Sequence, residues 1–289
     1  MKITNNTNLP QVFVDIAQED YTYKKGEYSV TELLKGIREI RLTREHYHEI
    51  EVDVSNMSNL IFGNAVHHLL ELKDTHNVTE KKLKVKVGDK WLKGRFDAYD
   101  SETYTLIDYK TASSYKIKKG MFEDWRKQGL MYAWLCKQNG IYVDKVQFIV
   151  MIKDWKARDE ISPIYVYEFK VLTLDLREIE EWIKARFLLL DTDTPCTETE
   201  RWTTPTKYAV MKNGGKRALK VYNNKEDCVG GDYIETRLGT DKKCESYCDV
   251  KQWCKYYKGE METQHPTEIS LKEAKKKLNE NISFKEEKK

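Results

Sequence analysis

A heptapeptide at 105–111, with the sequence TLIDYKT, has the residue types needed for phosphodiester chemistry. In a strand, residues two apart project from the same face, so Asp108 and Lys110 would point together while Ile107 and Tyr109 face the opposite layer. A carboxylate can hold a divalent cation that polarises a phosphate, and an ammonium beside it can orient water or stabilise the pentavalent charge. Taken alone, however, an Asp-x-Lys triplet more often marks an ion pair at a solvated strand end.

A second acid lies eleven residues upstream, where the sequence GRFD at 94–97 ends an apolar segment. If the two segments pair as strands, Asp97 and Asp108 can share one cation or bridge two. Magnesium prefers hard oxygen ligands and retains several waters, which suits a site with two acids. The pair of acids therefore strengthens the interpretation of the triplet as a metal-dependent catalytic motif.

A helix predicted upstream of these strands offers a possible nitrogen ligand. Gly63, His67 and Glu71 are four residues apart and therefore share one helix face. His67 could complete the coordination of the cation, and Gly63 could allow close approach of backbone, although a lone helical histidine is more often a core or surface residue. His68 points about 100° away and is assigned no role. For Glu71, metal binding through water and pairing with a lysine both stay open.

Downstream, the sequence QGLMY at 128–132 places two polar groups four residues apart on another predicted helix. The amide of Gln128 and the phenol of Tyr132 could hydrogen-bond to DNA or to the catalytic lysine. An ordinary surface glutamine and half-buried tyrosine would have the same spacing. These two residues are therefore kept as candidates that depend on the neighbouring motifs.

The elements that must position these residues follow from apolar periodicity, capping and turn signals. Their order predicts an α/β fold with a mixed central sheet flanked by helices, within one large domain or a core with an appendage. We expect a lead-in and helix at 1–54, a core at 55–190, an irregular region at 191–265 and a charged tail at 266–289. The predicted helices are 29–40, 55–73, 122–137 and 174–190, and the predicted strands are 82–87, 91–99, 103–110, 145–153 and 164–172.

The motifs, in the order Gly-x3-His, Gly-x2-Asp, Ile-Asp-Tyr-Lys-Thr and Gln-x3-Tyr, resemble the RecB-like branch of the PD-(D/E)XK nucleases. That branch includes phage exonucleases and the CRISPR adaptation nucleases that carry an iron–sulfur cluster. The resemblance covers roughly residues 60–172 and implies a restriction-endonuclease-like core. Four motifs in this order are far more specific than any one of them.

The resemblance also implies roles for individual residues. It assigns Mg²⁺ or Mn²⁺ to His67, Asp97, Asp108 and the backbone carbonyl of Tyr109. It makes Lys110 the catalytic lysine, while Gln128 and Tyr132 contact DNA or brace that lysine. Asp108 stands where many relatives have Glu, and the shorter side chain would bring the ion nearer the strand.

Three of the six cysteines, Cys244, Cys248 and Cys254, crowd into eleven residues near the C-terminus. Zinc and iron–sulfur sites both need four ligands. We expect Cys196 to be the fourth, because it would fasten the irregular region to the core, with Cys228 as the alternative. We expect a [4Fe–4S] cluster, with zinc or unligated thiols as alternatives. The spacing of three and five residues, and the absence of a cysteine before the catalytic motifs, depart from the iron–sulfur nucleases.

Cys136 falls within the predicted 122–137 helix and is expected to be a small buried apolar residue. Six cysteines without a recognisable secretory signal argue against a disulfide framework, and we expect a cytoplasmic, possibly phage-encoded, protein. No apolar run in the sequence approaches the roughly 20 residues needed to span a bilayer.

Composition neither requires nor excludes nucleic acid, because 50 basic and 47 acidic residues leave a net charge of +3. Two basic groups would give salt-sensitive DNA binding with little sequence specificity, although either can be a solvated face. They comprise Lys116, Lys118, Lys119, Arg126 and Lys127, and then Lys207, Lys212, Lys216, Arg217 and Lys220.

We expect a metal-dependent DNA nuclease that acts in recombination, repair or phage DNA processing. An exonuclease is preferred over a site-specific endonuclease by family analogy alone. A catalytically silent DNA-binding module of the same fold is the alternative from another class, and the intact Asp97, Asp108 and Lys110 count against it. An iron–sulfur redox sensor with coincidental nuclease motifs is a weaker alternative.

Overall fold

A five-stranded sheet forms the centre of the computed structural model, which describes residues 1–18 and 23–260. Its strand order is β10-β9-β8-β7-β4. β8 and β9 are parallel and the other neighbours are antiparallel, so the sheet is mixed, as predicted. The strands are β4 (Val78–Thr79), β7 (Ala98–Asp100), β8 (Thr105–Ala112), β9 (Lys145–Ile152) and β10 (Ile164–Lys170).

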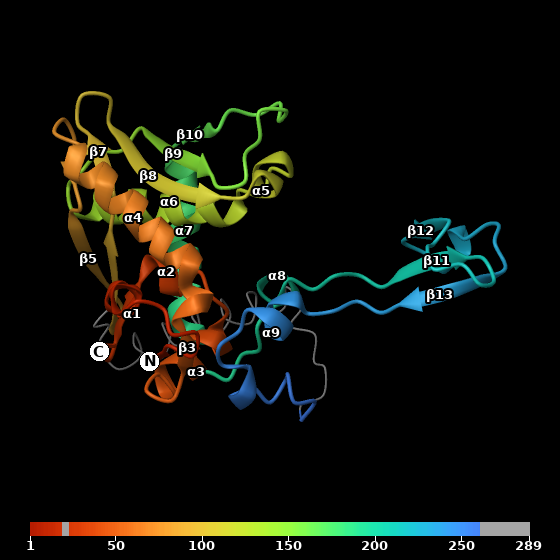
Figure 1. Ribbon diagram of the computed structural model, residues 1–289. Helices are drawn as coiled ribbons and strands as arrows, with labels where there is room; N and C mark the ends of the chain where they lie inside the picture. The colour runs from red at the N-terminus through yellow and green to blue at the C-terminus, as the bar shows by residue number, and fades with distance from the viewer. Residues whose placement is uncertain (19–22, 261–289) are drawn as a thin grey trace.

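Helices cover both faces of this sheet (Figure 1). α6 (Glu123–Gln138) packs on β8 and β9, and α7 (Thr173–Leu189) packs against α6. α4 (Ser58–Lys73) crosses the opposite face and contacts β8. The predicted layer of helices on each side of a mixed sheet is therefore confirmed, and the helix bounds agree with the predicted ones to within a few residues.

A smaller sheet, in the order β2-β6-β5, lies beside the central one. It contains β2 (Glu27–Ser29) and the predicted hairpin of β5 (Lys82–Val87) and β6 (Lys90–Arg95). The chain then leaves this sheet and enters β7 in the central one. The single predicted strand at 91–99 is therefore wrong: it is two strands in two sheets, because the intervening Phe96 turns into the core and is 1% exposed.

The predicted helix at 29–40 is also divided. It begins with the expected capping box of Ser29 and Glu32, but α2 (Val30–Leu33) ends before Gly36, and α3 (Ile37–Glu45) follows. A Cβ atom at Gly36 would collide with the Cys196 Sγ, so the break brings the backbone against that thiol. Both helices contribute buried residues to the main core, which also contains Phe148 and Met131.

The remaining N-terminal elements support the start of α4, and a short helix follows β8. β1 pairs in parallel with β3, and α1 packs against η1 and α4. They are β1 (Lys2–Thr4), α1 (Gln11–Ala17), β3 (Glu51–Asp53), η1 (Val54–Met57) and α5 (Ser114–Lys118).

The C-terminal region has short elements, as predicted, and three of its strands form a sheet that projects from the molecule. A three-stranded sheet in the order β12-β11-β13 stands away from the other layers (Figure 1), and we refer to residues 207–237 as the arm. No helix in the described ranges is long and apolar enough to cross a membrane. The elements are α8 (Glu198–Arg201), β11 (Lys207–Met211), β12 (Lys220–Tyr222), η2 (Lys225–Asp227), β13 (Tyr233–Arg237), α9 (Lys242–Ser246) and η3 (Lys251–Trp253). The predicted charged tail, residues 266–289, lies outside the described residues, which end at Glu260.

Candidate active site

The pairing of β7 with β8 brings the two predicted acids to neighbouring strands. Ala98 is opposite Ile107, and continuing this antiparallel register by one residue puts Asp97 opposite Asp108. The Asp97 Oδ2 accepts a hydrogen bond of 2.7 Å from the backbone N–H of Tyr109, which fixes the carboxylate against β8. Asp97 and Asp108, eleven residues apart in the sequence, therefore lie side by side because the chain reverses direction between them.

Asp108 and Lys110 share one face of β8, as their spacing predicts. The Lys110 Nζ lies 2.5 Å from the Asp108 Oδ2, and the Gln128 amide on α6 donates a 3.4 Å hydrogen bond to the Asp108 Oδ1. Asp108 is only 4% exposed. Burial raises the pKa of Asp108 to about 6 against the opposing effect of the Lys110 charge, and the nearby Asp97 raises it further. The fold thus holds a carboxylate where its negative charge is costly without a cation.

His67 on α4 meets Asp97 from the other side of β8. The His67 Nδ1 lies 3.3 Å from the Asp97 Oδ2, and its hydrogen bond to Asp97 raises the pKa of the imidazole. His68 is exposed, in keeping with its different helix direction, and Glu71 is exposed as well. Gly63 faces inward, but a Cβ there would meet its first neighbour, Thr111, at an ordinary 3.8 Å. Close backbone approach therefore does not require glycine at this position.

Tyr132 lies one turn after Gln128 on α6 and is almost fully buried. Burial raises the pKa of its phenol far above the ordinary range, and the Asp108 charge adds to this effect, while a hydrogen bond with Gln128 opposes it. A Cβ atom at Gly94 would lie 2.7 Å from the Tyr132 ring, so β6 can approach α6 only with glycine there. Gly94 in the GRFD sequence thus has a packing role that its spacing alone did not reveal.

Glu80 and Arg95 border the same site and were not singled out in the sequence. Their side chains lie 2.5 Å apart, and the Glu80 backbone N–H donates to the Asp97 carbonyl at 3.1 Å. Burial raises the pKa of Glu80, against the Arg95 charge, while the charge of Asp97 raises it further. No motif or periodicity marks Glu80, because only the crossing from β6 to β7 brings it beside Asp97.

The side chains have the chemistry of a hard-metal site but are paired with one another. Among residues 1–18 and 23–260, no three His, Cys, Asp or Glu side chains converge as a ready metal-binding group. Asp108 turns towards Lys110 and Gln128, while Asp97 turns towards His67 and the Tyr109 N–H. The buried Asp108 Oδ2 has the Lys110 ammonium as its partner. Two carboxylates and an imidazole fit a magnesium- or manganese-like cation in type.

The two basic groups differ in how far acidic side chains neutralise their charges. In the first, Lys116 is 2.7 Å from Asp124, Lys118 is 2.8 Å from Asp159, and Arg126 is 2.9 Å from Asp175. In the arm, the described contacts include no acidic partner for Lys212, Lys216 or Arg217, which are exposed around the turn between β11 and β12. The arm therefore offers the less neutralised positive charge.

The predicted cysteine ligands lie around α3 and α9. The Gly36 approach places Cys196 at the start of α3, and Lys243 on α9 forms a 2.6 Å ion pair with Glu39 on α3. Cys248 and Cys254 pack on one small core cluster with Val250, whereas Cys228 lies in the arm. Burial raises the pKa of Cys196 to about 12 and of Cys244 to about 11, and it also raises the pKa of Cys248. Cys136 is buried within α6, as predicted.

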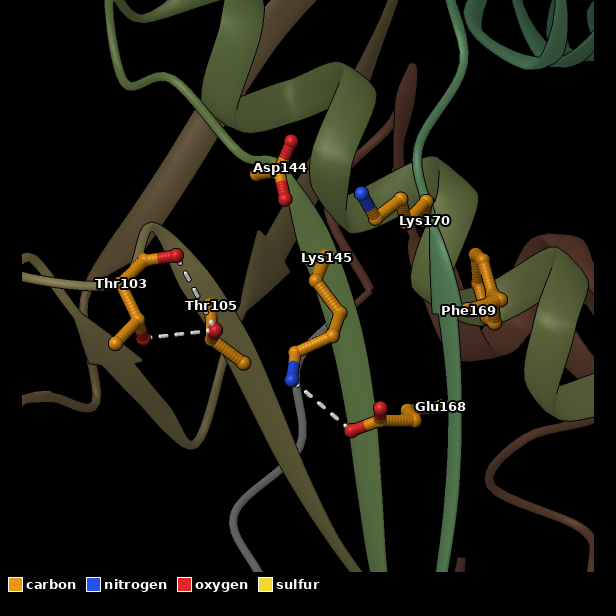
Figure 2. Close-up of a pocket in the computed structure, with 7 residues that line it drawn as sticks. All are labelled: Thr103, Thr105, Asp144, Lys145, Glu168, Phe169 and Lys170. Atoms are coloured by element: carbon orange, nitrogen blue, oxygen red, sulfur yellow. Dashed lines mark hydrogen bonds and ion pairs between the residues drawn. The ribbon is translucent and has the colours of Figure 1, made fainter.

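A cavity of about 450 Å³ lies at the opposite end of the central sheet (Figure 2). It opens where β8 and β9 begin, beside Thr105 and Lys145, and the Lys145 ammonium pairs with Glu168 at 3.0 Å. None of the predicted catalytic residues lines it. The cavity is therefore separate from the group formed by Asp97, Asp108 and Lys110.

No protein-family model matches this chain, and no curated protein does either. The crystal structure of a protein named SSO0001 is similar, with 23% identity, a TM-score of 0.50, and coverage of 66% of this chain and 90% of that one. An alkaline exonuclease from Laribacter hongkongensis matches at 14% identity and TM-score 0.38, covering 57% of this chain and 88% of its own. A phage-related exonuclease from Haemophilus somnus 129PT matches at 11% identity and TM-score 0.31, covering 62% and 76%. The last two likenesses are below a TM-score of 0.5 and do not bear on activity, so the comparisons support a shared fold with SSO0001 and no more.

Proposed function

We propose that this chain is a divalent-metal-dependent DNA nuclease of the PD-(D/E)XK type. The observation that carries the proposal is the buried Asp108, whose Oδ2 lies 2.5 Å from the Lys110 Nζ. Beside this pair, the Asp97 Oδ2 lies 3.3 Å from the His67 Nδ1. Two neighbouring carboxylates, one of them buried, repel each other unless cations compensate, and the Lys110 ammonium supplies one positive charge. Binding of Mg²⁺ or Mn²⁺ would compensate the remaining negative charge.

His67, Asp97, Asp108 and the Tyr109 carbonyl would hold the cation, which when bound polarises a phosphate and activates water. Asp108 would turn from Lys110 towards the metal, and this leaves the ammonium free to neutralise the developing phosphorane charge. Gln128 would keep Asp108 aligned through its amide, and Tyr132 would in turn hold Gln128.

DNA is the proposed substrate, with little sequence specificity. Lys212, Lys216 and Arg217 of the arm would contact backbone phosphates, because such contacts are independent of base identity. Exonuclease action from DNA ends, in recombination, repair or phage DNA processing, is preferred over site-specific internal cutting. A catalytically silent DNA-binding module would keep the arm contacts without needing Lys110 beside Asp108.

We also propose that Cys196, Cys244, Cys248 and Cys254 ligate a [4Fe–4S] cluster, with zinc as the alternative. Support comes from their grouping around α3 and α9 in a region with only a small apolar cluster. Metal ligation would add to the folding free energy of this segment. The position of Cys228 in the arm favours Cys196 as the fourth ligand. Neither metal is needed for the argument about Asp108 and Lys110.

One assay separates the nuclease readings. End-labelled linear DNA, single- and double-stranded, and closed circular DNA are incubated with the full chain with Mg²⁺, with Mn²⁺ or with chelator. We expect metal-dependent shortening from the ends of linear DNA and intact circles. Cutting of the circles would favour the endonuclease reading, whereas binding without cutting under all metal conditions would favour the silent module.

A further inference from the structure

An open cavity of about 340 Å³ lies between α3 and the last described segment, residues 253–260. Four basic side chains line it, Arg38 and Arg41 on α3 and Lys255 and Lys258 on the segment. Asp193, in the loop after α7, lines it as well. None of the candidate catalytic residues or cysteines is among the lining residues, so the sites described above do not explain this cavity.

The segment that carries the two lysines is held against α3. The rings of His46, at the end of α3, and Trp253, in η3, stack with centroids 4.3 Å apart and planes at 3°. After this stack, the backbone N–H of Lys258 donates a 3.1 Å hydrogen bond to the Cys254 carbonyl. Lys255 and Lys258 therefore lie on a folded turn beside the arginines of α3.

The two arginines share one acidic partner. Arg38 is only 2% exposed, and its Nε and Nη2 donate to the Oδ1 and the backbone carbonyl of Asp193 at 3.1 Å and 2.6 Å. The Arg41 Nη2 contacts the same Oδ1. The Asp193 side chain is 44% exposed, so water screens its charge. One carboxylate cannot neutralise two guanidinium groups, and a positive charge is left over at this wall.

Each arginine also has a buried donor that it does not use. Among residues 1–18 and 23–260, the Arg38 Nη1 and the Arg41 Nε are buried and have no hydrogen-bond partner. Arg38 and Arg41 are three residues apart and therefore share one face of α3. A buried donor of a charged group is costly when it has no acceptor, and in a native fold it indicates a bound ion or water. The unused donors point to an acceptor at this cavity.

The remaining charges favour an anion as that acceptor. Lys255 and Lys258 are exposed, and the contacts of the described chain give neither of them an acidic partner. Glu45 and Glu260 also line the cavity, so with Asp193 there are three acidic side chains against four basic ones. A local excess of positive charge attracts anions, and the volume is near the lower end for small-molecule sites.

We infer that this cavity binds a phosphate group. The Arg38 Nη1 and the Arg41 Nε would donate to its oxygens, and Lys255 and Lys258 would supply further positive charge. Guanidinium groups match the geometry of phosphate and carboxylate oxygens, and four basic side chains favour phosphate, which carries the greater negative charge. The inference does not depend on the proposed nuclease activity.

Thermal unfolding of the full chain in increasing inorganic phosphate, at fixed ionic strength and without added divalent metal, tests the site. A ligand that binds only the folded state raises the Tm as its concentration rises. Arg41→Gln removes a charge-assisted hydrogen bond and should weaken the apparent affinity for phosphate about tenfold. Lys258→Gln should weaken it less, because an exposed lysine contributes mainly its charge. Lys242→Gln is the matched control, since it removes one positive charge from an exposed position on α9 outside the cavity.

A second comparison identifies the source of the phosphate group. Oligonucleotides of one sequence, with a 5′-phosphate or a 5′-hydroxyl, are titrated without metal and followed by fluorescence anisotropy. Tighter binding of the phosphorylated strand, lost in Arg41→Gln, would support the site and assign it to the end of DNA. No difference between the strands, with the response to inorganic phosphate retained, would support the site and assign it to free phosphate or a nucleotide.

The phosphate series also contains the outcomes that would overturn the inference. No rise in Tm, or equal rises in the wild type, Arg41→Gln, Lys258→Gln and Lys242→Gln, would overturn it, because phosphate that is merely excluded from the surface stabilises all of them alike. A rise lost in Lys110→Ala and retained in Arg41→Gln would also overturn it and place the anion at the candidate active site. A rise reduced in Arg41→Gln and Lys258→Gln, and retained in Lys242→Gln and Lys110→Ala, would support the phosphate site beside α3.

Discussion

The Lys110 ammonium lies 2.5 Å from the Asp108 carboxylate on one face of β8, with Asp108 almost fully buried. If Asp108 binds a cation, as proposed, that cation competes with the Lys110 ammonium for the carboxylate. Substitutions at these two residues therefore test the proposal directly.

Asp108→Ala and Lys110→Ala should each abolish DNA cleavage while leaving the fold intact. Loss of a metal-binding carboxylate or of the cation that stabilises the phosphorane should raise the barrier by several kcal/mol, about a thousandfold or more in rate. Cleavage rates and circular dichroism are measured together. Lys145→Ala is the matched control, because Lys145 is ion-paired at the other end of the sheet. Wild-type rates in the folded Asp108 and Lys110 variants would falsify the assignment.

His67→Ala should weaken metal binding or turnover, whereas His68→Ala should have much less effect. Only His67 lies against Asp97, and its neighbour is exposed on the same helix. Activity is titrated against Mn²⁺ in both variants, and we expect the half-saturating concentration to rise in the first alone. A larger defect in the His68 variant would show that the helix face is misassigned.

Asp108 should make stability depend on pH in the metal-free protein. Its pKa is raised from 3.8 to about 6 by burial, so the folded state favours the protonated form. Stability is therefore lost as pH rises from about 4 through 6, by up to about 3 kcal/mol for this group. Urea unfolding at a series of pH values should show Asp108→Asn gaining stability relative to wild type across this window. A difference that does not change with pH would contradict the raised pKa.

Two glycine substitutions should have opposite effects on stability. Gly94→Ala places a Cβ 2.7 Å from the Tyr132 ring and should cost about 1–3 kcal/mol through overpacking. Gly63→Ala meets only an ordinary contact at 3.8 Å and should stabilise α4 by up to about 1 kcal/mol. Thermal unfolding of both variants measures the difference. Equal destabilisation would mean that α4 also needs glycine.

Anaerobically purified protein should contain iron and labile sulfide, with absorption near roughly 400 nm. Cys196→Ser should lose the cluster and expose the C-terminal region to protease, because a ligand between α7 and α8 would be missing. Cys136→Ser is the control, since its thiol is buried within α6. Stoichiometric zinc without sulfide would show that the site binds zinc instead of a cluster. Metal loss in Cys228→Ser but not in Cys196→Ser would identify Cys228, in the arm, as the fourth ligand.

Local patterns in the sequence determined most elements of the core and the shared direction of Asp108 and Lys110. A period of two is enough to place residues two apart on one strand face, and a period of 3.6 separates His67 from His68. Both directions agree with the structure, as does the capping box of Ser29 with Glu32. These features depend on backbone geometry within a few residues, which a sequence contains directly.

Only the tertiary structure decided which segments meet. The crossing from β6 to β7 divides one apolar run between two sheets and brings Glu80 beside Asp97, and Cys196 lies against the break before α3 at Gly36. The burial of Asp108 is likewise set by α6 packing over β8. Such contacts join residues distant in sequence and depend on how whole layers pack, so no local pattern contains them.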